Sequence, residues 1–131
     1  MNNIKCDEFQ KNVSELLIRH KSILDILSKI AEAQARINRA VSKSVTYCGC
    51  IQVKATKQCI PYDGTIKDLQ ECMNTHIEGE LCDNCKDVIE KEIGNTLFYI
   101  TSLCNVLDIS LHEVLIKEIE KLNTLGIYNM L

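Results

Sequence analysis

The segment ILDILSKIAEAQARINRAV, residues 23–41, decides the fold class of this chain. Its apolar residues recur at intervals of three and four, which is the period of an α-helix with one apolar face. The same spacing begins near Val13, and no helix-breaking residue stands between Asp7 and Val45. The sequence therefore predicts a first helix over about 7–45. Because so long a helix would exceed the width of a small domain, a bend or break is plausible at RHKS, Arg19 to Ser22.

Three more helices are predicted C-terminal to the first. Two of them begin with a capping pattern, Thr65 with Asp68 and Ser110 with Glu113, and Asp83 can cap the third. The single Pro and five Gly leave little material for turns, which favours long helices. The chain is therefore predicted to be an all-α four-helix bundle in a single domain, residues 1–131. The three helices are expected at about 65–78, 83–107 and 110–123.

The overall composition excludes some classes of partner. The net charge is -3 and the sequence pI is about 5.6, so nucleic acid and anionic membranes are not expected partners. The polar N-terminus lacks the apolar run of a signal peptide, and no later stretch is long and apolar enough to span a bilayer. The predicted location is the cytoplasm.

The helical pattern stops in a cysteine-rich loop between the first and second predicted helices, residues 46–64. Its core, YCGCIQVKATKQCIPYDG, contains the only Pro and several β-branched residues, so we expect an irregular connection with a short extended piece. The whole chain has eight Cys. Because thiols stay reduced in the cytoplasm, closely paired Cys favour a metal site or catalysis over disulfides.

Two cysteine pairs have spacings suited to one metal ion. Cys82 and Cys85 form a C-x2-C pair at the start of the third predicted helix, and Cys48 and Cys50 form a tighter pair after the first. If these helices pack antiparallel, both pairs lie at the same end of the bundle. Four thiolates at tetrahedral positions are the ligand set of structural zinc, which we favour over an iron-sulfur cluster.

Two other interpretations of the cysteines stay open. Cys is often a buried small apolar residue, which is the expected role of Cys72 and Cys104, whereas Cys6 and Cys59 have no assigned role. The C-x2-C pair could instead be a redox pair, since a helix N-terminus lowers a thiol pKa. The chain lacks the βαβ pattern of a thioredoxin-like fold, which weighs against that role.

The segment EKEIGNTLFYITSLCNVLDISLHEVLIKEIEKL, Glu90 to Leu122, resembles the MazG-like branch of the all-α nucleoside triphosphate pyrophosphohydrolases. One helix of that family carries Glu-x-x-Asp, and an earlier helix carries Glu-Glu-x-x-Glu, whose best match here is LSKIAEAQARINRAV, Leu27 to Val41. The resemblance implies three properties. These are carboxylates that bind magnesium, a nucleotide as the ligand, and assembly into a homo-oligomer such as a dimer. The cysteine loop is not part of the usual family pattern.

The expected magnesium ligands are depleted. Glu32 and Glu92 stand at acidic positions, but Ala33, Arg36 and Asn95 occupy others. An Arg among the ligands would repel a divalent cation. We therefore expect a catalytically weak or inactive relative with a binding or regulatory role. The alternatives are an active magnesium-dependent pyrophosphohydrolase, in which Glu32 and Glu92 are joined by Asp25 or Glu90, and a sensor that releases zinc on oxidation.

The three histidines are expected to be surface or structurally satisfied residues, since they are spread along the chain without a catalytic partner at a suitable spacing. They are His20, His76 and His112. Only His76 lies near the cysteine pairs in sequence, where it could replace a missing zinc ligand.

Overall fold

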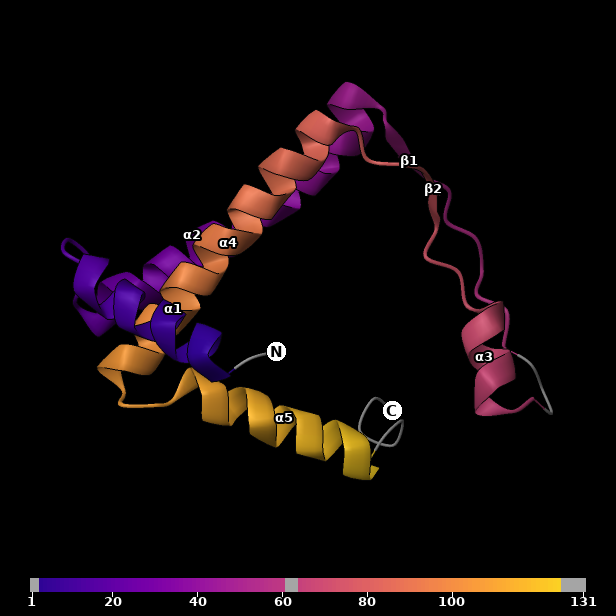
Figure 1. Cartoon of the computed structure of the whole chain (residues 1–131). Helices are drawn as coiled ribbons and strands as arrows, with labels where there is room; N and C mark the ends of the chain where they lie inside the picture. The colour runs from indigo at the N-terminus through magenta and orange to yellow at the C-terminus, as the bar shows by residue number, and fades with distance from the viewer. Residues whose placement is uncertain (1–2, 61–63, 126–131) are drawn as a thin grey trace. The chain divides into compact units, whose positions relative to one another are not determined.

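The computed structural model describes residues 3–60 and 64–125, and most of these residues are helical (Figure 1). Residues 61–63 of the predicted loop lie outside the described ranges. The predicted all-α class is confirmed at this coarse level. Within the described ranges, the elements in chain order are α1 (Asn3–Leu16), α2 (Ile23–Lys43), the π-helix η1 (Ser44–Cys48), β1 (Ile51–Val53), α3 (Ile66–Cys72), β2 (Ile77–Gly79), α4 (Asp83–Val106) and α5 (Leu111–Leu125).

The chain divides into two compact units, where the sequence predicted a single domain. Unit 1 comprises Met1–Ala35 with Ile93–Leu131, and unit 2 comprises Arg36–Glu92. Unit 2 is compact by itself because its strands pair with each other and β1 contacts η1. Helices α2 and α4 each contribute residues to both units.

The segment predicted as one long helix is interrupted where the break was expected. Helix α1 ends at Leu16 and α2 begins at Ile23, so the interruption covers residues 17–22. Leu17 is buried directly after α1, and its N–H still donates to the Val13 carbonyl at 3.0 Å. The interruption gives α1 an orientation of its own, and α1 packs against α5 within unit 1.

Within unit 1, a polar contact holds α1 against the turn that links α4 to α5. The Gln10 side chain donates to Asn105 Oδ1 at 2.9 Å and to the Ile109 carbonyl at 2.8 Å, and it accepts from the Leu111 N–H at 2.9 Å. Asn105 donates in return to the Gln10 carbonyl at 3.2 Å. Asp108 forms this turn with a left-handed φ of 56°.

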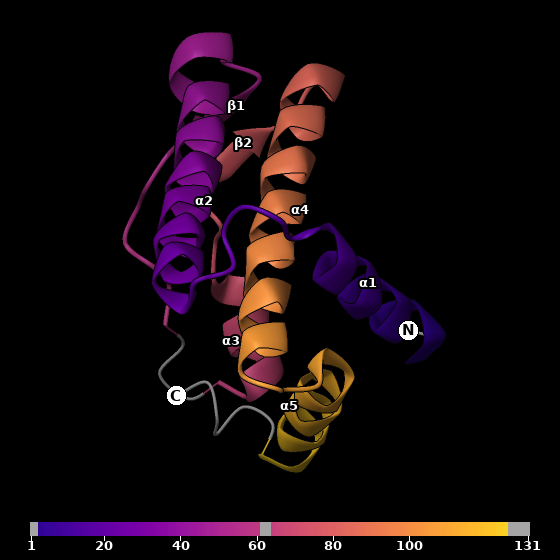
Figure 2. The same cartoon turned by 90° about the vertical axis from the view of Figure 1, so that its left-hand side faces the viewer.

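Apart from Lys29, the less exposed residues of α2 follow a heptad-like stripe that ends at Ser44 in η1. Such a stripe is suited to packing along a second helix. Within unit 2, the C-terminal part of α2 and the N-terminal part of α4 run alongside each other in opposite directions (Figures 1 and 2). The stripe comprises Ile23, Ile26, Ile30, Ala33, Ile37, Ala40 and Ser44.

Between these helix ends the chain forms a two-stranded ribbon, residues 49–81, which carries α3. Strands β1 and β2 are antiparallel, with Ile51 opposite Gly79 and Val53 opposite Ile77. Beyond the strands, the Lys54 N–H donates to the His76 carbonyl at 2.9 Å. Lys54 also forms an ion pair with Glu78 at 3.2 Å.

Helix α3 is shorter than predicted. Thr65 and Asp68 form a reciprocal capping box at its start, but it ends at Cys72, whereas the sequence predicted a helix to about residue 78. Met73 is already extended and His76 has a φ of 62°, so the chain leaves helical geometry and enters β2. Pairing with β1 outweighs the helical spacing of Met73 and Ile77.

No single described helix combines the length and apolar content needed to cross a membrane. The bent pair of α4 and α5 meets these two criteria only when both helices are counted together.

Candidate metal centre

Four cysteines from two short segments of unit 2 meet at one point. Cys48 ends η1 and Cys50 precedes β1, whereas Cys82 precedes α4 and Cys85 lies in its first turn. The four Sγ atoms all lie within 4.8 Å of one another. The meeting of the two pairs, predicted from their spacing and from antiparallel helices, is therefore found, and this cluster could hold a metal ion.

The geometry of the cluster fits a tetrahedral metal. With zinc to sulfur distances of about 2.3 Å, the edges of the sulfur tetrahedron are about 3.8 Å. Cys48 Sγ and Cys82 Sγ are 3.8 Å apart, and no pair among the four exceeds 4.8 Å. These separations are compatible with one metal ion bound by all four sulfurs.

The first cysteine pair is shaped by a wide helical turn. The Gly49 N–H donates to the Ser44 carbonyl at 2.9 Å. This bond spans five residues, as in a π-helix, and it closes the last turn of η1. Gly49 then adopts a left-handed φ of 78°, a conformation that glycine enters without a Cβ clash. This turn reverses the chain between Cys48 and Cys50, so both sulfurs reach the same point.

The second cysteine pair uses the start of α4. Cys82 Sγ accepts from the Cys85 N–H at 3.4 Å, and the Cys82 carbonyl accepts from the Lys86 N–H at 2.9 Å. Cys82 thus caps the helix with its sulfur, a role that the sequence had assigned to Asp83. The N-terminal end of a helix favours negative charge, so it stabilises a thiolate at this position.

Glycine 79 brings the returning strand against the first cysteine pair. A Cβ at this position would lie 2.6 Å from the Cys50 carbonyl oxygen, and the φ of Gly79 is 88°. Only glycine fits such a close approach and such a backbone angle without strain. Sequence reasoning missed this residue, although an isolated Gly next to a β-branched stretch is a signal of close backbone approach.

The pKa values of the thiols reflect their mutual contact. The pKa of Cys82 is lowered to about 7, first by the hydrogen bond from the Cys85 backbone and then by the neighbouring thiols. A hydrogen bond with Ser44 lowers the pKa of Cys85, but Cys82, desolvation and the other thiols outweigh it and raise that pKa to about 12. Four adjacent sulfurs therefore resist full ionisation by themselves, and a bound cation would favour the thiolate form of all four.

The four cysteines of the cluster differ in their exposure to solvent. Cys85 is buried, Cys50 and Cys82 are half-buried, and Cys48 is exposed. A cavity of about 220 Å³ opens beside Cys48 and Cys85, between the end of α2 and the start of α4. The cluster is therefore partly shielded from water and remains accessible from the side of Cys48.

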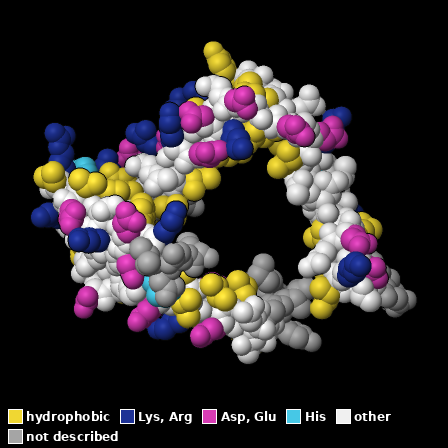
Figure 3. Space-filling view, in the orientation of Figure 1, with side chains coloured by type: hydrophobic (Ala, Val, Ile, Leu, Met, Phe, Trp, Pro, Cys, Tyr) yellow, Lys and Arg dark blue, Asp and Glu magenta, His cyan; other side chains and the backbone are white. Residues whose placement is uncertain are grey.

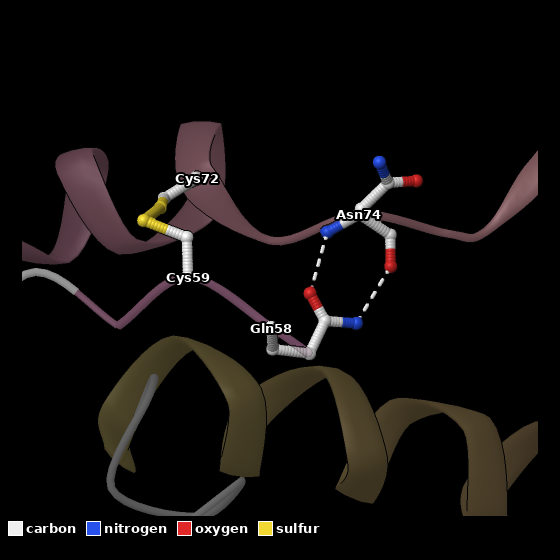
Figure 4. Close-up of a disulfide and its surroundings, with 4 residues drawn as sticks. All are labelled: Gln58, Cys59, Cys72 and Asn74. Atoms are coloured by element: carbon white, nitrogen blue, oxygen red, sulfur yellow. Dashed lines mark hydrogen bonds between the residues drawn. A yellow bond between two sulfur atoms is a disulfide. The ribbon is translucent and has the colours of Figure 1, made fainter. Parts of the chain in front are cut away.

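Two further cysteines form a disulfide at the far end of the ribbon. Cys59 and Cys72 are bonded across a sequence separation of 13 (Figure 4). Beside them, Gln58 Nε2 donates to the Asn74 carbonyl at 2.8 Å, and the Asn74 N–H donates to Gln58 Oε1 at 2.9 Å. The prediction of Cys72 as a buried small apolar residue is therefore wrong, because Cys72 is half-buried and cross-linked.

The remaining cysteines belong to unit 1. Cys104 is buried with 9% of its surface exposed, which confirms its prediction as a buried small residue, and Cys6 is also buried. His76 is not part of the four-cysteine group found among the described residues, so it replaces no ligand there.

The carboxylates predicted from the family resemblance are not gathered within one unit. Glu32 belongs to unit 1, is exposed, and pairs with Lys29 at 3.1 Å. Asn95 also belongs to unit 1 and is exposed, whereas Glu92 is half-buried in unit 2. The ion pair of Glu32 agrees with its expected role as a solvated helix residue. A magnesium site stays a prediction.

No protein-family model matches this chain, and no curated protein or solved structure is significantly similar to it. A functional assignment rests on the cysteine cluster and its surroundings.

Proposed function

We propose that this chain is a zinc-binding helical protein in which one zinc ion is held by Cys48, Cys50, Cys82 and Cys85. The observation that carries this proposal is the approach of all four Sγ atoms to within 4.8 Å of one another. Thiolates are soft ligands, and a set of four suits a tetrahedral zinc ion.

The proposed role of this zinc is structural. Four protein ligands complete the coordination of zinc, whereas catalytic zinc sites keep one position for water or substrate. The ion would join two segments separated by the ribbon, and so fix both ends of the ribbon to the ends of α2 and α4. Such a link is valuable because a two-stranded ribbon is marginally stable by itself.

For the protein as a whole we propose a binding or regulatory role in place of hydrolysis. The proposed relationship to MazG-like pyrophosphohydrolases places Ala33, Arg36 and Asn95 at positions where that family carries carboxylates. Magnesium binding needs several hard oxygen ligands, which these side chains do not supply as carboxylates do. A nucleotide is the ligand class that the resemblance favours.

A second copy of the chain is the proposed partner. In support, α5 carries five large apolar residues that are 38% to 49% exposed, and no described residue of α5 is buried (Figure 3). Apolar stripes of this kind mark interaction surfaces in soluble proteins. Size-exclusion chromatography with light scattering tests this, and a monomer at high concentration would contradict it. The residues are Val114, Ile116, Ile119, Leu122 and Leu125.

Elemental analysis tests the zinc proposal. Protein purified with zinc in the medium is expected to contain one zinc per chain, and the double variant Cys82→Ser with Cys85→Ser is expected to contain none. The matched control is Cys59→Ser with Cys72→Ser, which removes two cysteines outside the cluster and should keep the zinc. Iron with visible absorption would identify a cluster instead, and zinc retained after loss of Cys82 and Cys85 would overturn the site.

A second candidate function is sensing of oxidants, favoured by the 3.8 Å separation of Cys48 Sγ and Cys82 Sγ. In this reaction the two thiolates lose two electrons to hydrogen peroxide and form a disulfide, and the peroxide, with two protons, becomes two waters. Loss of two ligands would release the zinc. A chromogenic zinc indicator measures the release, and mass spectrometry locates the new disulfide. Retention of zinc while peroxide oxidises a small-molecule thiol in the same tube would exclude this function.

A further inference from the structure

Ser44 is a buried polar residue between the two cysteine pairs. Its exposure is 1%, and it occupies the first position of η1, where the packed stripe of α2 ends. A buried hydroxyl requires hydrogen-bond partners, so the contacts of Ser44 indicate what holds it there.

The backbone of Ser44 contacts the first cysteine pair. Its carbonyl accepts from the Gly49 N–H at 2.9 Å and from Cys50 Sγ at 3.8 Å. The N–H contact closes the turn that carries Cys48 and Cys50. Ser44 therefore fixes the position from which the Cys50 sulfur points into the cluster.

The hydroxyl of Ser44 has two possible hydrogen-bond acceptors. It donates to the Ala40 carbonyl at 3.0 Å, and it also lies within hydrogen-bonding reach of the Cys85 thiol, with which it lines the same cavity. A hydroxyl has a single proton, so Ser44 can donate to the Ala40 carbonyl or to Cys85, but not fully to both at once. When the proton turns to Cys85, the bond to the Ala40 carbonyl is exchanged for one to the sulfur.

Metal binding changes which of these contacts is favourable. Once Cys50 and Cys85 are thiolates, Cys50 no longer donates to the Ser44 carbonyl, and Cys85 becomes a charged acceptor. Four thiolates around one divalent ion leave a net negative charge, which hydrogen-bond donors around the sulfurs stabilise. Ser44 supplies a buried donor at Cys85, the most buried sulfur of the four.

We propose that Ser44 is a positioning residue of the metal centre, whose hydroxyl donates to the Cys85 thiolate and whose carbonyl sets the turn that carries Cys50. This proposal rests on the proposed zinc site. It assigns to one serine the task of orienting a ligand from each cysteine pair.

The test compares Ser44→Ala with Thr46→Ala in the full chain. Thr46 is a matched control because its hydroxyl also donates to a carbonyl four residues earlier, Ser42 O at 2.9 Å, but Thr46 is exposed and does not line the cavity beside Cys85. Zinc affinity is measured by competition with a chromophoric chelator. The expected result is one zinc per chain in both variants, with affinity about 10- to 100-fold weaker for Ser44→Ala and little changed for Thr46→Ala.

Cobalt substitution separates positioning from packing. Loss of a hydrogen bond to a thiolate should shift the sulfur-to-cobalt charge-transfer band to lower energy, whereas a general loss of packing should leave the band in place. Ser44→Thr keeps a hydroxyl and should restore the position of the band. If the alanine variant does not fold, Ser44→Cys provides a weaker donor of similar size and should show an intermediate shift.

The outcomes distinguish this proposal from the zinc site itself. A wild-type chain that binds neither zinc nor cobalt removes the site on which the proposal rests. A wild-type chain that binds zinc, together with unchanged affinity and an unchanged cobalt band in Ser44→Ala, overturns the role of Ser44 alone. Equal losses of affinity in Ser44→Ala and Thr46→Ala would also overturn it.

Discussion

The Cys50 carbonyl oxygen lies against Gly79 so closely that a Cβ on residue 79 would be 2.6 Å from it. This contact joins a predicted metal ligand to the strand that returns toward Cys82. It follows directly from the pairing of Ile51 with Gly79. The ribbon and the cysteine cluster therefore depend on each other through the backbone, in addition to any metal.

Replacement of Gly79 by Ala should destabilise unit 2. The new methyl group would meet a backbone oxygen, and the left-handed φ of 88° strains any residue with a Cβ, so we expect a loss of about 2 kcal/mol or more. Zinc affinity should fall as well, because Cys50 must move. Chemical denaturation of the zinc-saturated protein and chelator competition measure the two effects.

Gly94→Ala is the control for the same added methyl group. Gly94 lies within α4, and apart from its own helix no described atom lies within 4 Å of the place that a Cβ would take. Ala is a better helix former than Gly, so this variant should gain about 0.5 to 1 kcal/mol. Equal stability of the two glycine variants would contradict the close approach at Gly79.

Replacement of Gln10 by Ala should loosen α1 from the turn between α4 and α5. It removes three hydrogen bonds made by the half-buried side chain, and leaves the Leu111 N–H without its acceptor. We expect a cost of about 2 kcal/mol, or about 30-fold faster amide exchange in α1. Hydrogen exchange with mass spectrometry measures it. The exposed Gln34 in α2 is the control, and Gln34→Ala should change exchange little.

Replacement of Thr65 by Ala should fray α3 without affecting the metal. The hydroxyl accepts from the Asp68 N–H at 3.2 Å, and this half of the capping box would be lost at a cost of about 1 kcal/mol. Exchange of the α3 amides should accelerate, while the zinc content stays constant. Thr65→Ser keeps the oxygen and should behave like wild type, so fraying in both variants would argue against the cap.

Removal of the Cys59–Cys72 disulfide should make the end of the ribbon easier to open. A cross-link over a separation of 13 restricts the unfolded chain, which corresponds to about 3 kcal/mol in the loop-entropy model. The paired serine variant should therefore show faster exchange in α3, with β1 and β2 less affected. Unchanged exchange would mean that the Gln58 and Asn74 contacts alone hold this end.

The sequence was most informative where structure depends on residues close together in the chain. Helical spacing predicted α2 and α4, and the short C-x-C and C-x2-C spacings identified the four sulfurs that meet. Each pair is shaped by its own local turn, and the antiparallel course of the two helices then brings the pairs together. The cluster could therefore be predicted from the local Cys spacings together with the assumption that the two helices pack antiparallel.

The ribbon was not predictable in the same way. Met73 and Ile77 have helical spacing, so local periodicity extended α3 beyond Cys72, whereas pairing with β1 imposes a strand. The disulfide was not predictable from local spacing either, because Cys59 and Cys72 are 13 residues apart and follow no short paired pattern. The expectation that the thiols are reduced also favoured a metal site over a disulfide.

The 3.8 Å gap between the Cys48 and Cys82 sulfurs has a consequence for protein engineering. Because the ends of the ribbon are already adjacent, the segment between them forms a closed excursion whose length adds only slowly to the entropy of closure. The part of that segment beyond the paired strands, residues 54–76, could be exchanged for a longer or shorter insert while Cys50 and Gly79 keep their places. The cysteine cluster thus offers an anchorage for grafted peptides.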